Sequence, residues 1–297
     1  INMKILRLYL ASFLFSILTG QVSTEHLYYG APSLGLAGSD VAIPKQSWSV
    51  FVNPAGSAYQ KSPVFIAGSE SLFGQDYLSH SFAGANFQLS GIGSFGITLE
   101  NFSVNYGGNT LSNETAIGFH QGILLRSDRN STIAFGYGVR NYSVDYGKSA
   151  GVSGDGSDGI NLGSHNSLGV DVGVMASLAK RIRFGARAFN INSPSIGEAN
   201  SSVRLPQRVQ VGIAFSPYDL VWTTAAITRS VGHATNFHAG MSYAISDNFF
   251  LRSGIQTDPN RFATGFGVII KKIHIDYGLL THPVLPVTHQ VSIEVNR

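Results

Sequence analysis

The sequence predicts an all-β protein, a transmembrane antiparallel β-barrel of about fourteen strands with an N-terminal plug segment in its lumen. Charged residues make up only 12% of the 297 residues, about half of the roughly 25% typical of soluble domains. After the N-terminus, the chain has no run of 18 or more apolar residues, which excludes a bundle of membrane helices. A closed sheet is the remaining structure that satisfies its own backbone hydrogen bonds in lipid.

Residues 1–20 have the features of a secretory signal peptide. Met3 is followed by the basic residues Lys4 and Arg7 and then by an apolar stretch at residues 8–18, which is the order expected for such a segment. We therefore expect export and a location in the bacterial outer membrane. Removal of residues 1–20 lowers the number of basic residues from 20 to 18, against 17 acidic ones. This near-neutral balance argues against a nucleic-acid partner.

Residues 21–61 are expected to form the plug, because residues 33–59 follow neither a helix nor a strand period for long. The core of this stretch is Asn53-Pro54-Ala55-Gly56. Proline restricts Asn53 to extended geometry and Gly56 permits a left-handed turn, so the motif predicts a sharp corner. An irregular segment of this kind needs an enclosure that supplies partners for its backbone. The alternative interpretation is an ordinary loop corner.

Residues 62–297 are expected to form the barrel, because apolar residues alternate with polar or small ones as in a sheet between two solvents. The C-terminal strand shows the pattern clearly, since Val291 and Ile293 alternate with Gln290 and Ser292. Glycine is frequent on the predicted inward face and leaves room for a plug or a ligand. These glycines are Gly96, Gly118, Gly136, Gly138, Gly173, Gly212, Gly265 and Gly267.

The links between the expected strands alternate in length, which favours an outer-membrane barrel over a soluble β-sandwich. Short links are expected at residues 90–93, 127–130, 179–180, 216–218, 246–247 and 271–272. Longer links are expected at residues 105–112, 147–166, 192–205 and 230–234. Outer-membrane barrels have short periplasmic turns and longer external loops, so both termini are expected on the periplasmic side.

Two motifs, one near each end, resemble a known superfamily. The N-terminal motif is LGLAGSDVAIPKQSWSVFVNPAGSAY, and the C-terminal hairpin runs from DYGL through THPVL to THQVS. Both are similar to the fatty-acid-transporter (FadL) type of outer-membrane barrel, and in particular they resemble the PorV/PorQ family of the type IX secretion system. The resemblance implies a non-enzymatic barrel with an N-terminal plug.

Charged residues of the predicted inward face are the candidate ligand-facing groups of the lumen. They are Arg140, Arg183, Arg187, Arg208, Asp276 and Glu294. The alternative is that these residues form structural ion pairs and plug contacts, which are individually weak in a wet lumen.

No cofactor or metal site is predicted. The SGDGSDG run at residues 153–159 lacks the spacing and the closing glutamate of a calcium loop. The chain has no G-x-S-x-G motif between a strand and a helix, so we expect no enzyme.

Two functions follow from the resemblance. A PorV/PorQ protein would act in protein secretion or surface attachment, with secretion-system proteins or secreted cargo as partners. A FadL-type protein would pass long-chain fatty acids or other hydrophobic small molecules across the outer membrane. The predicted polarity of the lumen favours the first, because a pocket for acyl chains should be mostly apolar. In either case we expect a monomeric barrel in outer-membrane lipid.

Overall fold

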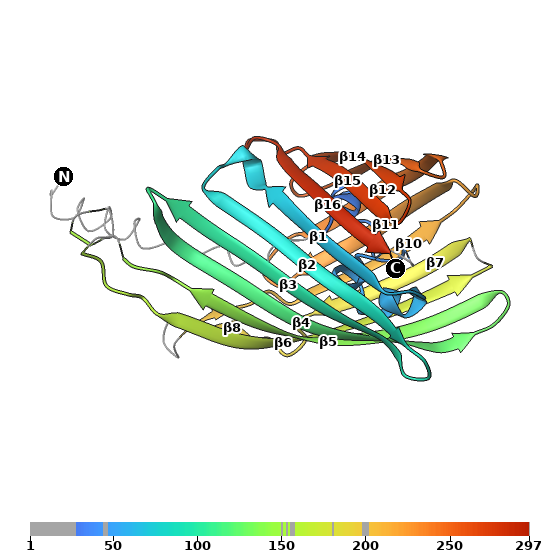
Figure 1. Ribbon diagram of the computed structural model, residues 1–297, viewed down its shortest axis with the longest axis horizontal. Coiled ribbons are helices and arrows are strands. Elements are labelled where there is room, and N and C mark those ends of the chain that lie inside the picture. The colour runs from blue at the N-terminus through green and yellow to red at the C-terminus, as the bar shows by residue number, and fades with distance from the viewer. Residues whose placement is uncertain are drawn as a thin grey trace.

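A computed structural model describes residues 28–43, 47–149, 151–152, 154, 158–179, 181–197 and 202–296 of the chain. Fourteen strands form one closed barrel in which sequential neighbours pair and β1 pairs with β16. This confirms the predicted all-β antiparallel barrel (Figure 1). The predicted signal peptide lies outside the described residues. Among these residues, no helix is long and apolar enough to cross a membrane.

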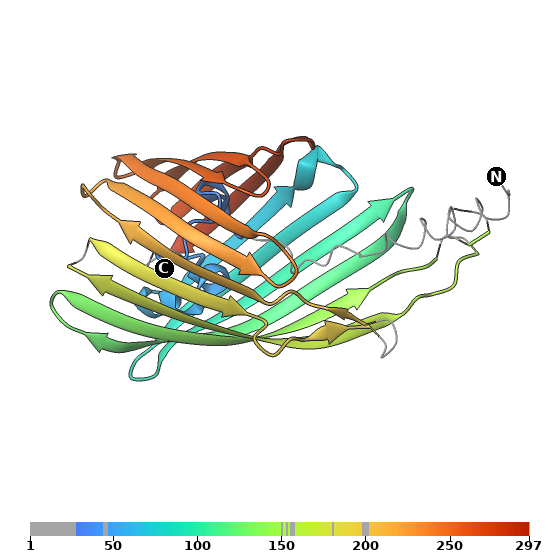
Figure 2. The same cartoon turned by 180° about the vertical axis from the view of Figure 1, so that it is seen from behind.

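The barrel strands differ in length around the circumference. They are β1 (Val64–Ser71), β2 (Leu78–Leu89), β3 (Gly93–Tyr106), β4 (Asn109–Ser127), β5 (Ser131–Asp145), β6 (Ser164–Leu178), β7 (Ile182–Phe189), β10 (Arg208–Phe215), β11 (Val221–Ser230), β12 (Thr235–Ser246), β13 (Phe249–Gln256), β14 (Arg261–Ile270), β15 (Ile273–Leu280) and β16 (Thr288–Asn296). Strands β3 to β6 extend well beyond the rest and form a taller wall on one side (Figures 1 and 2).

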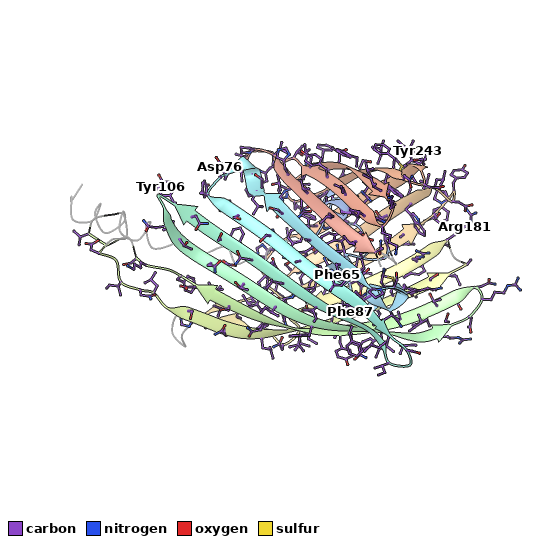
Figure 3. All side chains as sticks on the ribbon, in the orientation of Figure 1. Phe65, Asp76, Phe87, Tyr106, Arg181 and Tyr243 are labelled. Atoms are coloured by element: carbon purple, nitrogen blue, oxygen red, sulfur yellow. The ribbon has the colours of Figure 1, made fainter. Side chains whose placement is uncertain are left out.

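The predicted alternation of the strands is confirmed by their exposure. In β16, Val291 is 52% exposed on the outside, whereas its neighbour Gln290 is fully buried. The outward face carries a belt of aliphatic and aromatic side chains, as a lipid-facing surface requires. Phe65 and Phe87 form an edge-to-face ring pair on this surface toward one end of the barrel, whereas Tyr106 lies at the opposite tip (Figure 3).

Short turns gather at one end of the barrel and most of the longer loops at the other, as expected. Strands β13 and β12, for example, are joined through residues 247–248, whereas β5 and β6 are joined through residues 146–163. The long link expected at residues 105–112 is wrong, because β3 and β4 continue to a turn made by Gly107 and Gly108. Both glycines have positive φ, which a two-residue hairpin turn favours. Longer loops face outside in outer-membrane barrels, and this orientation stays a prediction for the long-loop end here.

The described residues of the plug segment, 28–43 and 47–59, lie inside the barrel (blue in Figures 1 and 2). The segment contains α2 (Ala31–Gly35), α3 (Ser49–Val52) and the 3-10 helix η2 (Pro54–Tyr59). Helix α2 lies against β14 and β15, and η2 lies against β4 and β5. Almost all described residues of the segment are buried, so in this structure the segment fills the lumen between the two sides of the wall.

A small hairpin from the loop between β7 and β10 folds inward at the long-loop end. Its strands are β8 (Ser195–Ile196) and β9 (Val203–Arg204). Ile196 and Leu205 are 1% and 2% exposed and pack with Tyr142 and Val144 on the inner face of β5. Burial of these loop residues covers part of the long-loop end of the lumen. The 3-10 helix η3 (Leu72–Gly74) lies between β1 and β2.

Candidate functional site

The NPAG motif of the plug lies on a row of glycines in the barrel wall. Gly122, Gly136 and Gly173 are direct cross-strand partners on β4, β5 and β6. A Cβ atom on Gly136 would overlap Ala55 N and the Pro54 carbonyl, and one on Gly173 would overlap the Asn53 side chain. The row therefore lets the plug backbone approach the sheet more closely than any side chain would permit.

Asn53 fastens the plug segment to this part of the wall. Its backbone is extended (φ −157°), as the following proline predicts. The side-chain Oδ1 accepts a hydrogen bond from Ala55 N at 3.1 Å, which caps η2. The Nδ2 donates to Val41 O at 3.0 Å and to Val174 O, on strand β6, at 3.3 Å. One side chain thus joins two parts of the plug to each other and to the barrel.

The left-handed turn expected at Gly56 is wrong. Gly56 belongs to the 3-10 helix η2 and is absent from the described residues with positive φ. Its lack of a side chain serves packing, because a Cβ atom there would lie 2.8 Å from Ser49 Oγ and 3.2 Å from Met175 Cε. The corner comes instead from Asn53 and Pro54, where an extended residue leads into the first turn of η2.

An aromatic cluster occupies the lumen beside β1 and β2. Tyr29 stacks on Phe51 with ring centroids 4.8 Å apart, and Trp48 meets Phe82 edge to face at 5.6 Å. Phe82 belongs to β2 and the other three rings belong to the plug segment. The remaining members are the buried aliphatic residues Val50, Val52, Val64 and Ile66. The lumen therefore has an apolar side, although its charged inward residues had predicted a polar lumen.

A buried polar chain borders this aromatic cluster. His80 Nδ1 lies 2.7 Å from Glu70 Oε2, and His80 Nε2 lies 3.0 Å from Glu100 Oε1. Tyr29 of the plug donates its hydroxyl hydrogen to Glu100 Oε2 at 3.1 Å. The three wall residues come from β1, β2 and β3, so the chain links the plug segment to three neighbouring strands.

Most of the predicted lumen residues do face inward, but they are spread around the wall. Arg140 lies 3.4 Å from Asp171 in an ion pair, and Arg187 donates to the Phe51 and Val52 carbonyls of the plug. These two guanidinium groups lie over the ring of Phe189, at 5.3 and 4.5 Å from its centroid. The structure thus brings Arg140 and Arg187 together around one aromatic ring.

The other four predicted residues make separate contacts. Asp276 pairs with Arg252 at 2.6 Å, and Arg208 Nε donates to Ser230 Oγ at 3.0 Å. Arg183 lies over the Trp222 ring at 4.4 Å. Glu294 lies 3.7 Å from His274. Each of these four side chains therefore contacts another residue of the wall.

Asp40 is a buried carboxylate of the plug segment, outside the strands that span the membrane. Burial raises the pKa of this carboxyl, whereas the nearby Arg187 guanidinium and the Ser33 hydroxyl favour its charged form. Ser33 Oγ donates to Asp40 Oδ1 at 3.0 Å. In the part of the chain that the structure describes, no group of three or more His, Cys, Asp or Glu side chains is arranged to hold a metal ion.

Comparisons with known proteins place this geometry among solved membrane barrels. No family model matches the sequence, and no curated protein matches it. The toluene transporter TbuX from Ralstonia pickettii matches with a TM-score of 0.63 and 12% identity, over 91% of this chain and 98% of that chain. The toluene transporter TodX from Pseudomonas putida matches with a TM-score of 0.61 and 12% identity, over 90% and 97%.

A FadL homologue from Pseudomonas aeruginosa matches with a TM-score of 0.60 and 9% identity, over 90% of this chain and 97% of that chain. At such identities the likeness concerns the fold alone. It extends over nearly the whole of each barrel. The chain therefore has the fold of the FadL-type outer-membrane barrels.

Proposed function

We propose that this protein passes small hydrophobic molecules across the outer membrane, and that the plug segment controls their passage. The observation that carries the proposal is the aromatic cluster, in which plug rings pack directly on Phe82 and Ile66 of the wall. Displacement of the plug would leave an apolar surface inside the lumen. Ligand sites for hydrophobic molecules are lined in this way, mainly by apolar and aromatic side chains with a few polar groups.

The nature of the solved relatives supports the same solute class. TbuX and TodX are toluene transporters, so a monoaromatic hydrocarbon is the first solute to test. Transport by these relatives also supports a role without catalysis. The long-chain fatty acids implied by the FadL resemblance are the next class, because their chains are also apolar.

The secretion function stays a prediction. It derives from the PorV/PorQ resemblance of the two sequence motifs, and no comparison adds support for that branch. The predicted polarity of the lumen favoured secretion, but the lumen beside β1 and β2 is lined by the apolar residues Phe82, Val64 and Ile66. Polarity therefore does not count against hydrophobic solutes.

The test is uptake of radiolabelled toluene by cells that contain the protein in an outer membrane with no other transporter of this class. We expect faster uptake than in cells without the protein. Phe82→Ala, which removes the wall ring of the cluster, should slow uptake several-fold. Phe250→Ala is the matched control, because Phe250 is a half-buried wall aromatic on β13, outside the cluster. Equal uptake with and without the protein would refute the proposal.

A further inference from the structure

Two rows of hydroxyl and amide side chains cross the outer face of the taller wall, and together we name them the polar wall. Each row runs across neighbouring strands through direct register partners. The first row is Ser69, Ser81, Asn101, Thr115, Ser143 and Asn166. The second row, one step nearer the long-loop end, is Ser79, Ser103, Asn113, Asp145 and Ser164. All eleven residues are exposed or half-buried.

The polar wall begins directly where the lipid belt ends. Two residues from the first row, in the direction away from the long-loop end, the cross-strand partners on β3 and β4 are Leu99 and Ile117. Both are exposed and apolar. The first row also has a lateral limit, because the partner of Ser69 on β16 is Val291, followed by Tyr277 on β15. The polar wall is therefore confined to the β1–β6 side of the barrel.

The height of the polar wall matches the head-group layer. Two residues along a strand span about 6.6 Å, which is roughly 5 Å of height for a strand tilted by about 40°. Two rows therefore reach on the order of 10 Å above the apolar belt. Head groups and interface add roughly 5 to 8 Å to each side of the hydrocarbon core. The rows lie where the polar parts of outer-leaflet lipids begin.

The chemistry of the polar wall selects one kind of head group. Its eleven positions contain no lysine or arginine and one acid, Asp145, whereas phosphate groups are recognised by lysine and arginine. Protein interfaces are enriched in aromatic residues and arginine and depleted in serine, so a protein partner fits poorly as well. Asparagine amides and serine or threonine hydroxyls both donate and accept hydrogen bonds, which is what the hydroxyl groups of neutral sugars require.

A hollow in the second row offers a seat for a sugar ring. It has a volume of about 440 Å³ and is lined by Ser103, Asn105, Thr110, Asn113, Asp145 and Gly147, and it falls in the range of roughly 300–1,000 Å³ of small-molecule sites. Thr110 Oγ1 donates to Asn105 Oδ1 at 2.8 Å, and Asn105 Nδ2 donates to Ser103 Oγ at 3.0 Å. These bonds hold the amide in one orientation before any ligand arrives.

We propose that the polar wall binds the neutral sugars of outer-leaflet glycolipids, with one sugar ring in the hollow between β3, β4 and β5. The acyl chains of the same lipid lie against Leu99, Ile117 and the rest of the belt below. The barrel thus has a glycolipid-binding side at β1–β6 and a side at β10–β16 without this surface.

The experiment compares two probes on the purified full-length protein in detergent, with bound lipid counted by native mass spectrometry. One probe is a lipid with an uncharged sugar head group, a digalactosyl diacylglycerol. The other is the diacylglycerol with the same acyl chains and no sugar. We expect the sugar-bearing probe to bind about tenfold more tightly, as two or so additional hydrogen bonds give. Equal binding of the two probes overturns the proposal.

Substitutions in the polar wall test where the sugar-bearing probe binds. The double variant Ser103→Ala with Asn113→Ala, a cross-strand pair of the second row, should abolish the tighter binding of the sugar-bearing probe. The double variant Thr115→Val with Ser143→Ala in the first row should abolish it too. The matched control is Ser253→Ala with Thr264→Ala, because these are exposed cross-strand partners on β13 and β14, on the opposite wall. A preference that survives in both test pairs, or that is lost equally in the control pair, contradicts the assignment of the binding face.

Discussion

Gly136→Ala is the sharpest probe of how the plug segment is seated. The added Cβ atom would overlap Ala55 N and the Pro54 carbonyl, which are backbone atoms that cannot turn aside as a side chain does. Overpacking of this kind costs about 1–3 kcal/mol, and that cost falls on the seated plug and not on strand pairing. The ratio of displaced to seated plug should therefore rise between about fivefold and 150-fold.

The assay is the entry of a small polar sugar into liposomes that contain the purified protein, followed by swelling. Gly136→Ala should swell faster than the unsubstituted protein, while both resist unfolding in detergent equally. Gly84→Ala is the control, because its Cβ atom would meet only wall atoms, Ile97 O at 3.1 Å and the Ile66 side chain at 3.3 Å. If Gly136→Ala is as tight to the sugar as Gly84→Ala, the glycine row does not determine how the plug is seated.

Three further predictions concern the plug and the wall. Asn53→Ala removes the cap of η2 and the bonds to Val41 and Val174; it should loosen the plug by about 1–2 kcal/mol, seen as faster protease cleavage within the segment. His80→Gln takes the imidazole from between Glu70 and Glu100 and should lower the free energy of unfolding in urea by about 3–5 kcal/mol, whereas an unchanged midpoint would contradict the chain as a structural link. Ile275→Arg should impair membrane assembly by about 2–4 kcal/mol and the adjacent inward His274→Gln far less, because the contact of His274 with Glu294 is partly exposed; equal damage would argue against a lipid-facing Ile275.

The barrel could be predicted from the sequence, because a wall between lipid and a filled lumen requires side chains to alternate in character along every strand. Val291 and Gln290 show this in adjacent positions, and the short turns could be placed from the same pattern. The β3–β4 turn was missed because Gly107 and Gly108 also suit a flexible loop. A tight turn is distinguished from a flexible loop only by the pairing of the two flanking strands, which continues to Tyr106 and Asn109.

The interior could be predicted only in part, because its contacts depend on strand register and on the path of the plug. Glu70, His80 and Glu100 lie on three strands and meet only when those strands align. Inward arginines were found from alternation, but alternation does not tell which of them meet, as Arg140 and Arg187 do over Phe189. The packing of the aromatic cluster could not be predicted, because three of its four rings come from the plug segment, where no period exists.

The central claim is that the plug segment must move for hydrophobic solutes to pass, and a disulfide lock tests it most directly. Ser57 Oγ of the plug lies 2.9 Å from Ser94 Oγ of β3, a separation that places the two Cβ atoms near disulfide range. The chain has no other cysteine, so Ser57→Cys with Ser94→Cys forms one defined crosslink. With the crosslink complete, toluene uptake should be lost and should return on reduction, while each single variant takes up toluene normally. Equal uptake by the fully crosslinked and the reduced protein would contradict the claim.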